Sequence, residues 1–150
     1  MLVGLISDTH GYFDPRLPDV FRGVERILHA GDIGSLDVIV HLEAIAPVVA
    51  VHGNMDSPLV ASRFPTDATV DVGGLRVYLV HRPHDARPGP DVRVVVHGHT
   101  HRSLIDEKGG MLYVNPGVAG KTRTFAGRTV ALLEIEGGAV HARIVTLSAP

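Results

Sequence analysis

The sequence contains no cysteine and no tryptophan, and only 5% of its 150 residues are aromatic. Without cysteine the protein cannot form disulfide bonds or thiolate-based zinc sites, and this composition suits a reducing compartment. The chain also lacks any apolar run long enough to span a membrane, and its first residues carry no basic leader. We therefore expect a cytoplasmic protein with neither a signal peptide nor a membrane anchor.

Charged residues are few, and no basic cluster stands out among them. They make up 20% of the chain, and the net charge is −2. A surface dedicated to nucleic acid would need concentrated positive charge, so we expect no such surface. The length predicts one domain over residues 1–150, and the hydrophobic content of 45% allows a sizeable core.

Histidine is abundant, with ten residues, and the most informative pair follows a predicted strand. The stretch Val92–Arg102 reads VRVVVHGHTHR, in which a run typical of a buried strand stops at Gly98 and is followed by His99 and His101. Side chains two positions apart in extended backbone point the same way, so we expect these two imidazoles to converge. A histidine pair at this spacing favours metal binding over a structural role.

The remaining pattern predicts an α/β fold. In the first half of the chain, predicted strands alternate with predicted helices, which indicates a parallel sheet with right-handed crossovers. These strands are 2–7, 26–30 and 47–52, and the helices are 19–26 and 35–46. In the second half, turns join strands into hairpins. These hairpins are 68–72/75–80, 103–107/111–114 and 129–136/139–147, with a strand at 92–97 and a proline-rich loop at 82–90. We expect a two-sheet αββα sandwich.

Side chains that can bind metal follow five of these strands, at the carboxyl ends where ligands of open α/β sheets gather. They are Asp8, His10, Asp32, Asn54, His81, His99 and His101. Each alone has an ordinary structural explanation, such as a helix cap for Asp32 or a turn for Asn54, but together they predict a metal site. Their nitrogen and oxygen donors suit Mn, Fe, Zn or Co. Seven ligands suit two ions that share one carboxylate, an arrangement that serves phosphoryl transfer.

The same residues carry a family resemblance. The chain resembles the calcineurin-like metallophosphoesterases, and its shortness resembles their small bacterial and archaeal phosphodiesterase branch. The resemblance lies in an ordered set of motifs: D-x-H (Asp8, His10), G-D (Gly31, Asp32), G-N-x-D (Gly53, Asn54, Asp56), a lone His81, G-H-x-H (Gly98, His99, His101) and N-P-G (Asn115–Gly117). It implies hydrolysis of phosphodiester bonds in a small phosphate-ester substrate by attack of metal-bound hydroxide.

The resemblance also implies a role for each matched residue. One metal ion would be held by Asp8, His10, Asp32 and His101, and the other by Asp32, Asn54, His81 and His99, so that Asp32 bridges the two ions. Asp32, Asn54 and His99 would be the catalytic residues, and Asp56 would orient a ligand or the backbone. The implied cofactor is a pair of divalent ions, with Mn²⁺ preferred over Fe, Zn, Co or Ni.

The chain departs from the family pattern at three places and lacks one residue of its larger members. His81 is followed by Arg82-Pro83 instead of glycine, and the proline-rich loop replaces a helix. Val118 stands where a serine commonly follows N-P-G. Met55 stands where many larger relatives carry a histidine that is thought to protonate the leaving oxygen, and a thioether cannot donate a proton.

Other polar residues near the motifs have weaker assignments. Structural roles are expected for His29, His52 and His97, and Thr100 is expected to be a spacer. His52 and His84 are alternative proton donors in place of Met55. Phosphate contacts are conceivable for Arg82, His84, Arg87 and Arg102, but a surface role is favoured for each of them.

Two other functions remain open on the sequence alone. One is a non-catalytic protein-binding scaffold on the same fold, and the other is a nucleotide or oligonucleotide hydrolase. The intact ligand set favours an enzyme, because scaffolds tend to lose metal ligands. We also expect a C2 homodimer, since the loop 82–90 is too short and too rich in proline to cover the apolar surface near it.

Overall fold

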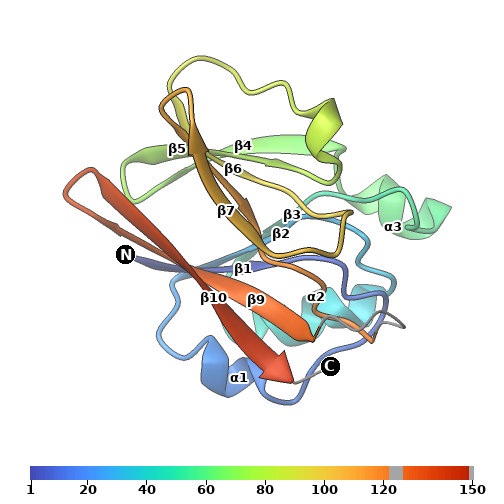
Figure 1. Cartoon of the computed structure of the whole chain (residues 1–150). Coiled ribbons are helices and arrows are strands. Elements are labelled where there is room, and N and C mark those ends of the chain that lie inside the picture. The colour runs from blue at the N-terminus through green and yellow to red at the C-terminus, as the bar shows by residue number, and fades with distance from the viewer. Residues whose placement is uncertain (122–126, 149–150) are drawn as a thin grey trace.

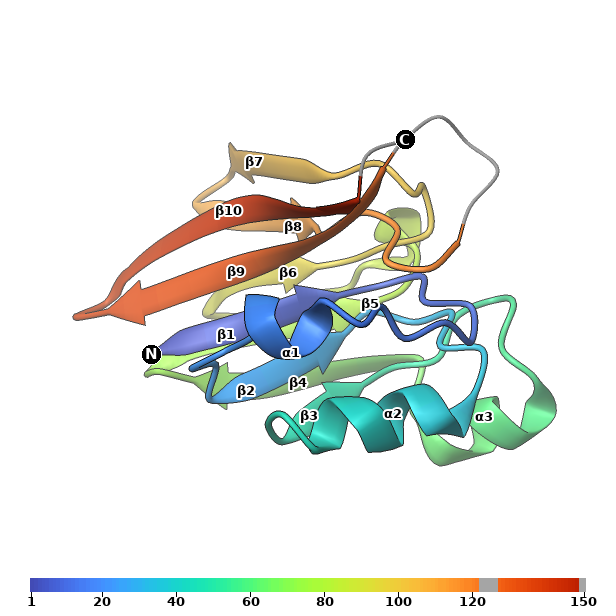
Figure 2. The same cartoon turned by 90° about the horizontal axis from the view of Figure 1, so that it is seen from below.

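The computed structural model of the chain describes residues 1–121 and 127–148, and it contains two five-stranded sheets packed face to face (Figure 1, Figure 2). The first sheet has the strand order β10-β9-β1-β2-β3, and the second has the order β4-β5-β6-β8-β7. The strands are β1 (Leu2–Ile6), β2 (Arg26–His29), β3 (Val48–Ala50), β4 (Asp67–Val72), β5 (Leu75–Val80), β6 (Val92–Val96), β7 (Leu104–Lys108), β8 (Met111–Asn115), β9 (Arg128–Glu136) and β10 (Ala139–Ser148). This arrangement confirms the predicted two-sheet sandwich.

The first sheet combines three parallel strands with an antiparallel hairpin. β1 pairs in parallel with β2, and β2 with β3, as the alternation of strands and helices predicts. On its other side β1 pairs antiparallel with β9, which turns back into β10. β1 is therefore a central strand, and Val3, Leu5 and Ile6 are completely buried. An apolar run of this kind suits a strand that is covered on both faces.

The second sheet is built from two hairpins around one central strand. β4 and β5 turn at Gly73-Gly74, and β7 and β8 turn at Gly109-Gly110. All four glycines have φ between 58° and 83°, the left-handed region that such tight turns require. β6 lies between β5 and β8 and runs parallel to both. Both predicted hairpins are thus confirmed.

Three short helices follow the first three strands: α1 (Leu17–Val20), α2 (Leu36–Glu43) and α3 (Pro58–Arg63). The predicted helix 19–26 is wrong, because α1 starts earlier with Pro18 in its first turn and stops before Gly23, whose φ is 83°. The Ser35 cap of α2 is confirmed, but the helix ends at Glu43 rather than near residue 46. α3 is absent from the predictions, although Ser57 caps it and a proline follows the cap, a usual signal of a helix start.

The helices cover the first sheet (Figure 2). Leu17, Ile39 and Val60 come from the three helices and pack with Ile6 and Val130 of the sheet in one apolar cluster. A second cluster fills the space between the two sheets, including Leu5, Leu28, Val77, Val94 and Leu133. No helix in the described part of the chain is long and apolar enough to cross a membrane.

The outer face of the second sheet carries no α-helix within the described residues. Val80, Val92 and Val95 on this face are nonetheless buried, and Ala86 of the loop 82–90 packs against them. The loop itself contains a 3-10 turn, η1 (Pro83–Asp85). Two expectations are therefore corrected: the helices flank one sheet only, and the loop does not leave the apolar surface beneath it open.

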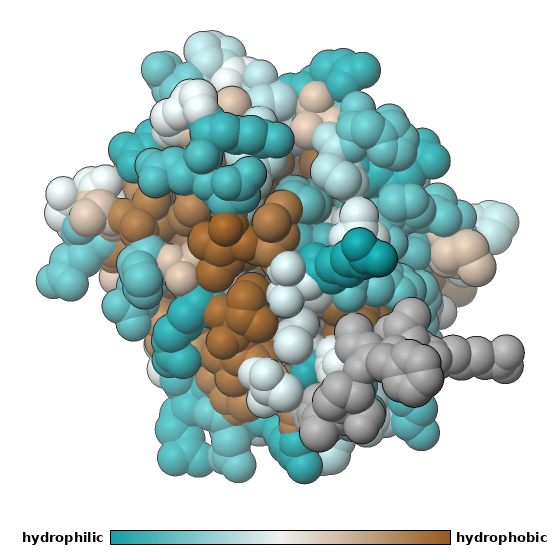
Figure 3. All heavy atoms as spheres, in the orientation of Figure 1, coloured by the Kyte–Doolittle hydropathy of each residue, from teal (hydrophilic) through white to brown (hydrophobic). Residues whose placement is uncertain are grey.

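An apolar area does reach the surface elsewhere, on the face shown in Figure 3. It lies in the region that β7 and β10 occupy in Figure 1. Leu104 and Ile105, both in the edge strand β7, are 44% and 40% exposed. Exposed apolar surface often marks an interface, so the C2 homodimer stays a prediction, now with β7 rather than the loop as its candidate contact.

Phe21, at the end of α1, tests the packing of the helices on the first sheet. Its side chain is completely buried, and its ring lies so close to Gly4 of β1 that a Cβ there would be 2.9 Å from it. Phe21→Ala should lower the free energy of unfolding by about 3–5 kcal/mol, measured by urea unfolding with a chelator present. Val40→Ala, at a side chain that is 63% exposed, is the control and should change it by less than about 0.5 kcal/mol. Equal values for the two variants would contradict this packing.

Candidate metal centre

The loops that follow five strands bring the predicted metal-binding side chains to one end of the sandwich. Asp8 and His10 follow β1, Asp32 follows β2, Asn54 follows β3, His81 follows β5, and His99 and His101 follow β6. The carboxyl ends of strands from both sheets therefore meet here, as open α/β sheets lead one to expect. Within this region the side chains form three contacting groups.

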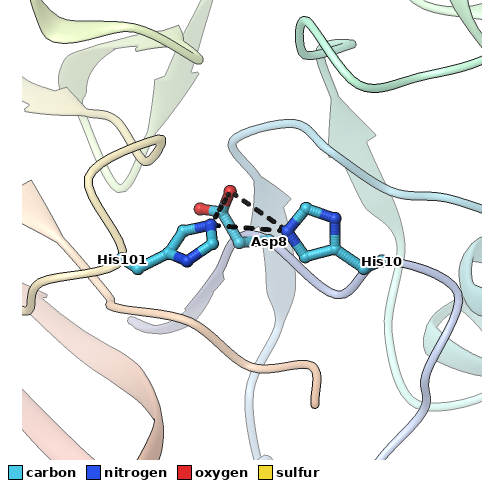
Figure 4. Close-up of side chains that lie close together, drawn as sticks. All are labelled: Asp8, His10 and His101. Carbon is cyan, nitrogen blue, oxygen red and sulfur yellow. Dashed lines mark hydrogen bonds and ion pairs between the residues drawn. The ribbon is translucent and has the colours of Figure 1, made fainter. Parts of the chain in front are cut away.

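The first group consists of Asp8, His10 and His101 (Figure 4). Asp8 Oδ1 lies 3.7 Å from His10 Nε2 and 3.3 Å from His101 Nε2, and the two Nε2 atoms are 3.4 Å apart. One oxygen and two nitrogens thus converge on the same small volume. The other oxygen of Asp8 is held in place, because it accepts hydrogen bonds from the Ser7 hydroxyl (2.7 Å) and the His99 N–H (3.1 Å).

The second group consists of Asp8, Asp32 and His81, all of them buried. His81 Nε2 lies 3.3 Å from Asp32 Oδ2 and 4.0 Å from Asp8 Oδ1. Asp32 Oδ1 accepts a hydrogen bond from the Met55 N–H at 2.9 Å, which fixes the orientation of the carboxylate. Asp8 is the residue that these first two groups share.

The third group joins His99 to Asn54. His99 Nδ1 donates to Asn54 Oδ1 at 3.1 Å, and the His99 ring lies at right angles to that of His81, with 5.3 Å between the centroids. Both side chains are largely exposed, whereas Asp8, Asp32 and His81 are not. The centre is therefore closed around Asp8, Asp32 and His81, and it reaches the surface both at His99 and Asn54 and at His10 and His101.

The hydrogen bonds of His81 show that the centre suits a cation. His81 Nδ1 lies 2.8 Å from the carbonyl oxygen of Ala30, and because a carbonyl only accepts, Nδ1 must carry the hydrogen. Nε2 then faces the two carboxylates, and both Nε2 and Asp8 Oδ1 are buried without a hydrogen-bond partner among the described residues. A nitrogen lone pair that faces a carboxylate needs a positive charge between them, which either a proton on Nε2 or a bound cation supplies. The imidazole and carboxylate donors gathered here are those that bind divalent transition metals.

The pKa values of the centre follow from the same charges. Burial opposes the charge on Asp32, but His81 and the Met55 N–H outweigh it and lower the pKa of this carboxyl. Burial also opposes the charge on His81, yet Asp32 and Asp8 outweigh it and raise the pKa of the imidazole. Contact with Asp8 raises the pKa of His101, while burial, together with His81, lowers the pKa of His99. The centre thus favours positive charge beside its two carboxylates.

Most of these side chains sit on backbone in the left-handed region. Of the six non-glycine residues with positive φ in the described structure, five belong to the centre: Asp8 (55°), His10 (48°), Asp32 (54°), His99 (74°) and His101 (63°). Such conformations are uncommon outside glycine and cluster at functional sites. They also correct the prediction that His99 and His101 converge. The backbone is not extended there, so His101 meets Asp8 and His10 while His99 meets Asn54.

Two motif glycines allow the loops to come this close. A Cβ on Gly98 would lie 2.0 Å from Ser7 Oγ and 2.6 Å from Asp8 Oδ2. A Cβ on Gly53 would lie 2.1 Å from Asp32 Oδ1. Any side chain at either position would therefore displace a carboxylate of the centre. The G-H-x-H and G-N-x-D motifs need glycine for this reason.

Thr9, between Asp8 and His10, forms a hydrogen bond with the buried His29. The sequence analysis expects only a structural role for this histidine. The Gly31 N–H donates to His29 Nδ1 at 3.1 Å, so the hydrogen of this neutral ring is on Nε2, which lies 3.0 Å from Thr9 Oγ1. The Thr9 hydroxyl in turn donates to the carbonyl of Ile33 at 2.8 Å. Complete burial lowers the pKa of His29 to about 4, which keeps the ring neutral. This chain of hydrogen bonds ties the loop after β1 to the loop after β2.

Thr100, between His99 and His101, has an equivalent anchor in Asn115. The buried Asn115 amide donates to Thr100 Oγ1 at 3.0 Å and to the Gly98 carbonyl at 3.2 Å, and its oxygen accepts from the Gly117 N–H at 2.9 Å. Thr100 is therefore more than the predicted spacer. In both loops the middle threonine is anchored and the residues on either side have positive φ.

Asp56 bridges two loops of the centre. Its Oδ1 accepts from the Gly34 N–H and its Oδ2 from the Gly53 N–H, both at 2.8 Å. Gly34 lies two residues after Asp32, and Gly53 directly precedes Asn54. Asp56 thus holds backbone on both sides, in line with the positioning role expected of it.

The remaining candidates lie around the centre rather than in it. His52 and Arg82 line a pocket next to Asn54 and His81. His97 and Arg102 line a separate groove with Tyr113. His84 is exposed and contacts Asp85, and the Arg87 side chain bonds backbone carbonyls within its own loop.

The fold and this centre together define a class of protein. It is an α/β sandwich with carboxylate and imidazole donors gathered at the carboxyl ends of its strands, as in metal-dependent enzymes that act on phosphate esters. The sequence profile of the calcineurin-like phosphoesterase superfamily domain matches residues 1–138. The chain belongs to this family.

Individual relatives agree with this assignment. A probable metallophosphoesterase from Methanothermobacter thermautotrophicus is 35% identical in an alignment that covers 100% of this chain and 95% of that protein. A phosphodiesterase from Methanocaldococcus jannaschii is 27% identical and covers 78% of this chain and 83% of its own. The crystal structure of Vps29 from Entamoeba histolytica, complexed with zinc, has a TM-score of 0.76 and 23% identity over 99% of this chain and 100% of its own. At that identity the likeness concerns the fold.

Asp56→Asn tests whether this carboxylate holds the centre together. An amide has one acceptor oxygen, so either Gly34 or Gly53 would lose its hydrogen-bond partner. We expect the free energy of unfolding of the metal-free protein to fall by about 1–3 kcal/mol in urea unfolding. The control is Asp19→Asn, whose carboxylate is 79% exposed, and it should cost less than about 0.5 kcal/mol. If Asp56→Asn is as stable as its control, these two hydrogen bonds do not hold the loops.

Proposed function

We propose that this protein is a dinuclear metal-dependent phosphodiesterase. One divalent ion is assigned to Asp8, His10, Asp32 and His101, and the second to Asp32, Asn54, His81 and His99. Mn²⁺ is the preferred ion. The observation that supports this best is a pair of buried atoms, His81 Nε2 and Asp8 Oδ1, which lie 4.0 Å apart among metal-binding donors and have no hydrogen-bond partner in the described part of the chain.

Each residue of the centre has a distinct task in this proposal. When bound, two ions lower the pKa of water toward neutrality and neutralise the charge of a phosphate ester. Asp8 and Asp32 supply the negative charge that retains cations, and their burial keeps water from weakening the attraction. His81 is turned toward them by the Ala30 carbonyl. His99 and Asn54 on one side, and His10 and His101 on the other, reach the surface, so a substrate approaches the centre past these exposed ligands.

The name of one relative supports a diester substrate, since the Methanocaldococcus protein is called a phosphodiesterase. The scaffold alternative is not separated from the enzyme by metal binding, because a Vps29 structure with the same fold was solved with zinc. Turnover separates the two functions. A protein that binds two ions and cleaves no ester would be a scaffold.

Metal content tests the ligand assignment. After reconstitution with Mn²⁺, elemental analysis of the wild type should give about two ions per chain. Asp32→Asn should weaken both sites, since Asp32 is the proposed bridge, whereas Asn54→Ala should mainly remove the second ion. Asp106→Asn, in the exposed strand β7, is the control for the loss of one carboxylate. A wild-type content of one ion or none would contradict the two-metal assignment. Loss of a single ion in Asp32→Asn would instead assign the bridging role to Asp8.

The leaving-group dependence tests the consequence of Met55. Its side chain is 70% exposed, and only its backbone N–H contacts the centre. Without a general acid, a contribution of about 10²–10⁴-fold is missing, most of all for poor leaving groups. We expect Mn²⁺-dependent cleavage of bis(p-nitrophenyl) phosphate and weak action on alkyl monoesters. A plot of log rate against leaving-group pKa should fall steeply. A flat plot would mean that another group donates the proton, and His52→Gln and His84→Gln would be the variants to measure next.

A further inference from the structure

A pocket of about 340 Å³ opens beside Asn54 and His81. Its other walls include His52, Thr66, Asp67, Val80, Arg82 and Asp85. None of these six belongs to the proposed ligand set. A phosphodiester bound at the metal centre would carry two ester groups, and this pocket shares two lining residues, Asn54 and His81, with that centre. It is therefore the place to look for recognition of one of those groups.

One part of the pocket lining, Arg82 and Asp85, lies in the segment after His81 where this chain departs from the family pattern. Arg82 stands where glycine is usual, and the 3-10 turn that follows brings Asp85 back to it, so that Arg82 Nε donates to Asp85 Oδ2 at 2.8 Å. This contact uses one donor of the guanidinium. Its terminal amino groups make no hydrogen bond within the described residues, and they remain available to a ligand.

Three further residues that line the pocket also have unused hydrogen-bonding groups. Asp67 Oδ2 accepts from the Tyr78 hydroxyl at 2.7 Å, while its Oδ1 has no partner among the described residues. His52 Nδ1 donates to the Phe64 carbonyl at 2.7 Å, which leaves Nε2 open. The Thr66 hydroxyl likewise has no partner in the described structure. The pocket thus offers both acceptors and donors along its lining.

This combination of hydrogen-bond donors and acceptors favours one kind of ligand group over others. A second anionic group would meet the carboxylates of Asp67 and Asp85, and an apolar group would meet a single apolar side chain, that of Val80. Adjacent hydroxyl groups fit best, because each hydroxyl both donates and accepts: carboxylates take the O–H donors while Arg82, His52 and Thr66 supply hydrogens to the oxygens. The volume lies in the range of small-ligand pockets.

We propose that this pocket binds a vicinal diol on one ester group of the substrate, such as that of a ribose or a glycerol unit, with Asp67 and Arg82 as the specificity-determining residues. This inference rests on the phosphodiesterase function proposed above and narrows its substrate class. Both kinds of diol present the same pair of adjacent hydroxyl groups, so the experiment must distinguish them.

The test uses the full-length protein loaded with Mn²⁺ and three diesters with one common leaving group. They are the p-nitrophenyl esters of uridine 5′-phosphate, glycerol 3-phosphate and propyl phosphate, of which the last has no hydroxyl. The propyl ester cannot form the hydrogen bonds between substrate hydroxyls and charged side chains. We therefore expect kcat/KM for at least one diol ester to exceed that of the propyl ester by about tenfold or more, mainly through a lower KM. The better of the two diol esters identifies ribose or glycerol as the source.

Substitutions then locate the selectivity. Arg82→Gln and Asp67→Asn should reduce the ratio of kcat/KM between diol and propyl esters to near one. Arg93→Gln and Asp106→Asn, exposed and outside the pocket, are the matched controls and should keep the wild-type ratio. The ratio is the readout because it cancels effects that slow all three substrates alike, and circular dichroism checks that each variant is folded.

The outcomes separate this inference from the proposed function. Turnover of all three esters with equal kcat/KM in the wild type would overturn the diol pocket and leave the phosphodiesterase standing. The same holds if the selectivity exists but survives both pocket substitutions. Absence of turnover on these esters and on bis(p-nitrophenyl) phosphate, in protein that contains both ions, would overturn the phosphodiesterase and the diol pocket together.

Discussion

Asp8 is a completely buried carboxylate, and the end of the molecule where the strands finish is arranged around it. An isolated charge in such a position is strongly unfavourable unless hydrogen bonds and opposite charge compensate for it. The Ser7 hydroxyl and the His99 N–H compensate one oxygen, and His10, His81 and His101 face the other. These partners come from loops on both sheets. The sandwich must therefore be assembled before Asp8 is stabilised, which couples the centre to the whole fold.

The loops reach this arrangement through backbone that is unfavourable on its own. Each non-glycine residue held in the left-handed region costs on the order of 1–3 kcal/mol, and it persists only where its surroundings over-determine it. Here the surroundings are specific: His29 and Asn115 anchor the two middle threonines, Asp56 holds two further loops, and glycine lets them touch. Rigid sheets on both sides keep these anchors in register. A centre built in this way is preorganised, because its donors already converge.

The two sides of the centre differ in their burial and in the residues that form them. The closed side consists of the buried side chains of Asp8, Asp32 and His81, all of which belong to the family motifs. The open side is bordered by Asn54 and His99, and next to it the 3-10 turn after His81 adds Arg82 and Asp85. This turn is short, and it gives the second sheet a thin cover. The turn after His81 thus determines both how one face of the second sheet is covered and which side chains lie beside the centre.

Much of this protein could be predicted from its sequence. Apolar runs that are followed by a metal-binding residue, after a glycine in three of the five cases, mark the strands and name all seven side chains of the centre, because strand ends and ligands coincide in this kind of sheet. The hairpins follow from their glycine pairs. The bounds of α1 are a different case, because Pro18 in its first turn and Gly23, with a φ of 83°, are local signals that the predicted helix 19–26 left unused.

Which side chains of the centre contact one another depended on tertiary structure alone. Spacing predicts that His99 and His101 point together, yet positive φ sends them to different partners. Nothing local indicates that conformation, because what stabilises it lies far along the chain: Asn115 for Thr100, and His29 for Thr9. The sequence by itself determined which donors are present. The packing of the two sheets decided which of them meet, since only a folded core can hold those loops in strained backbone.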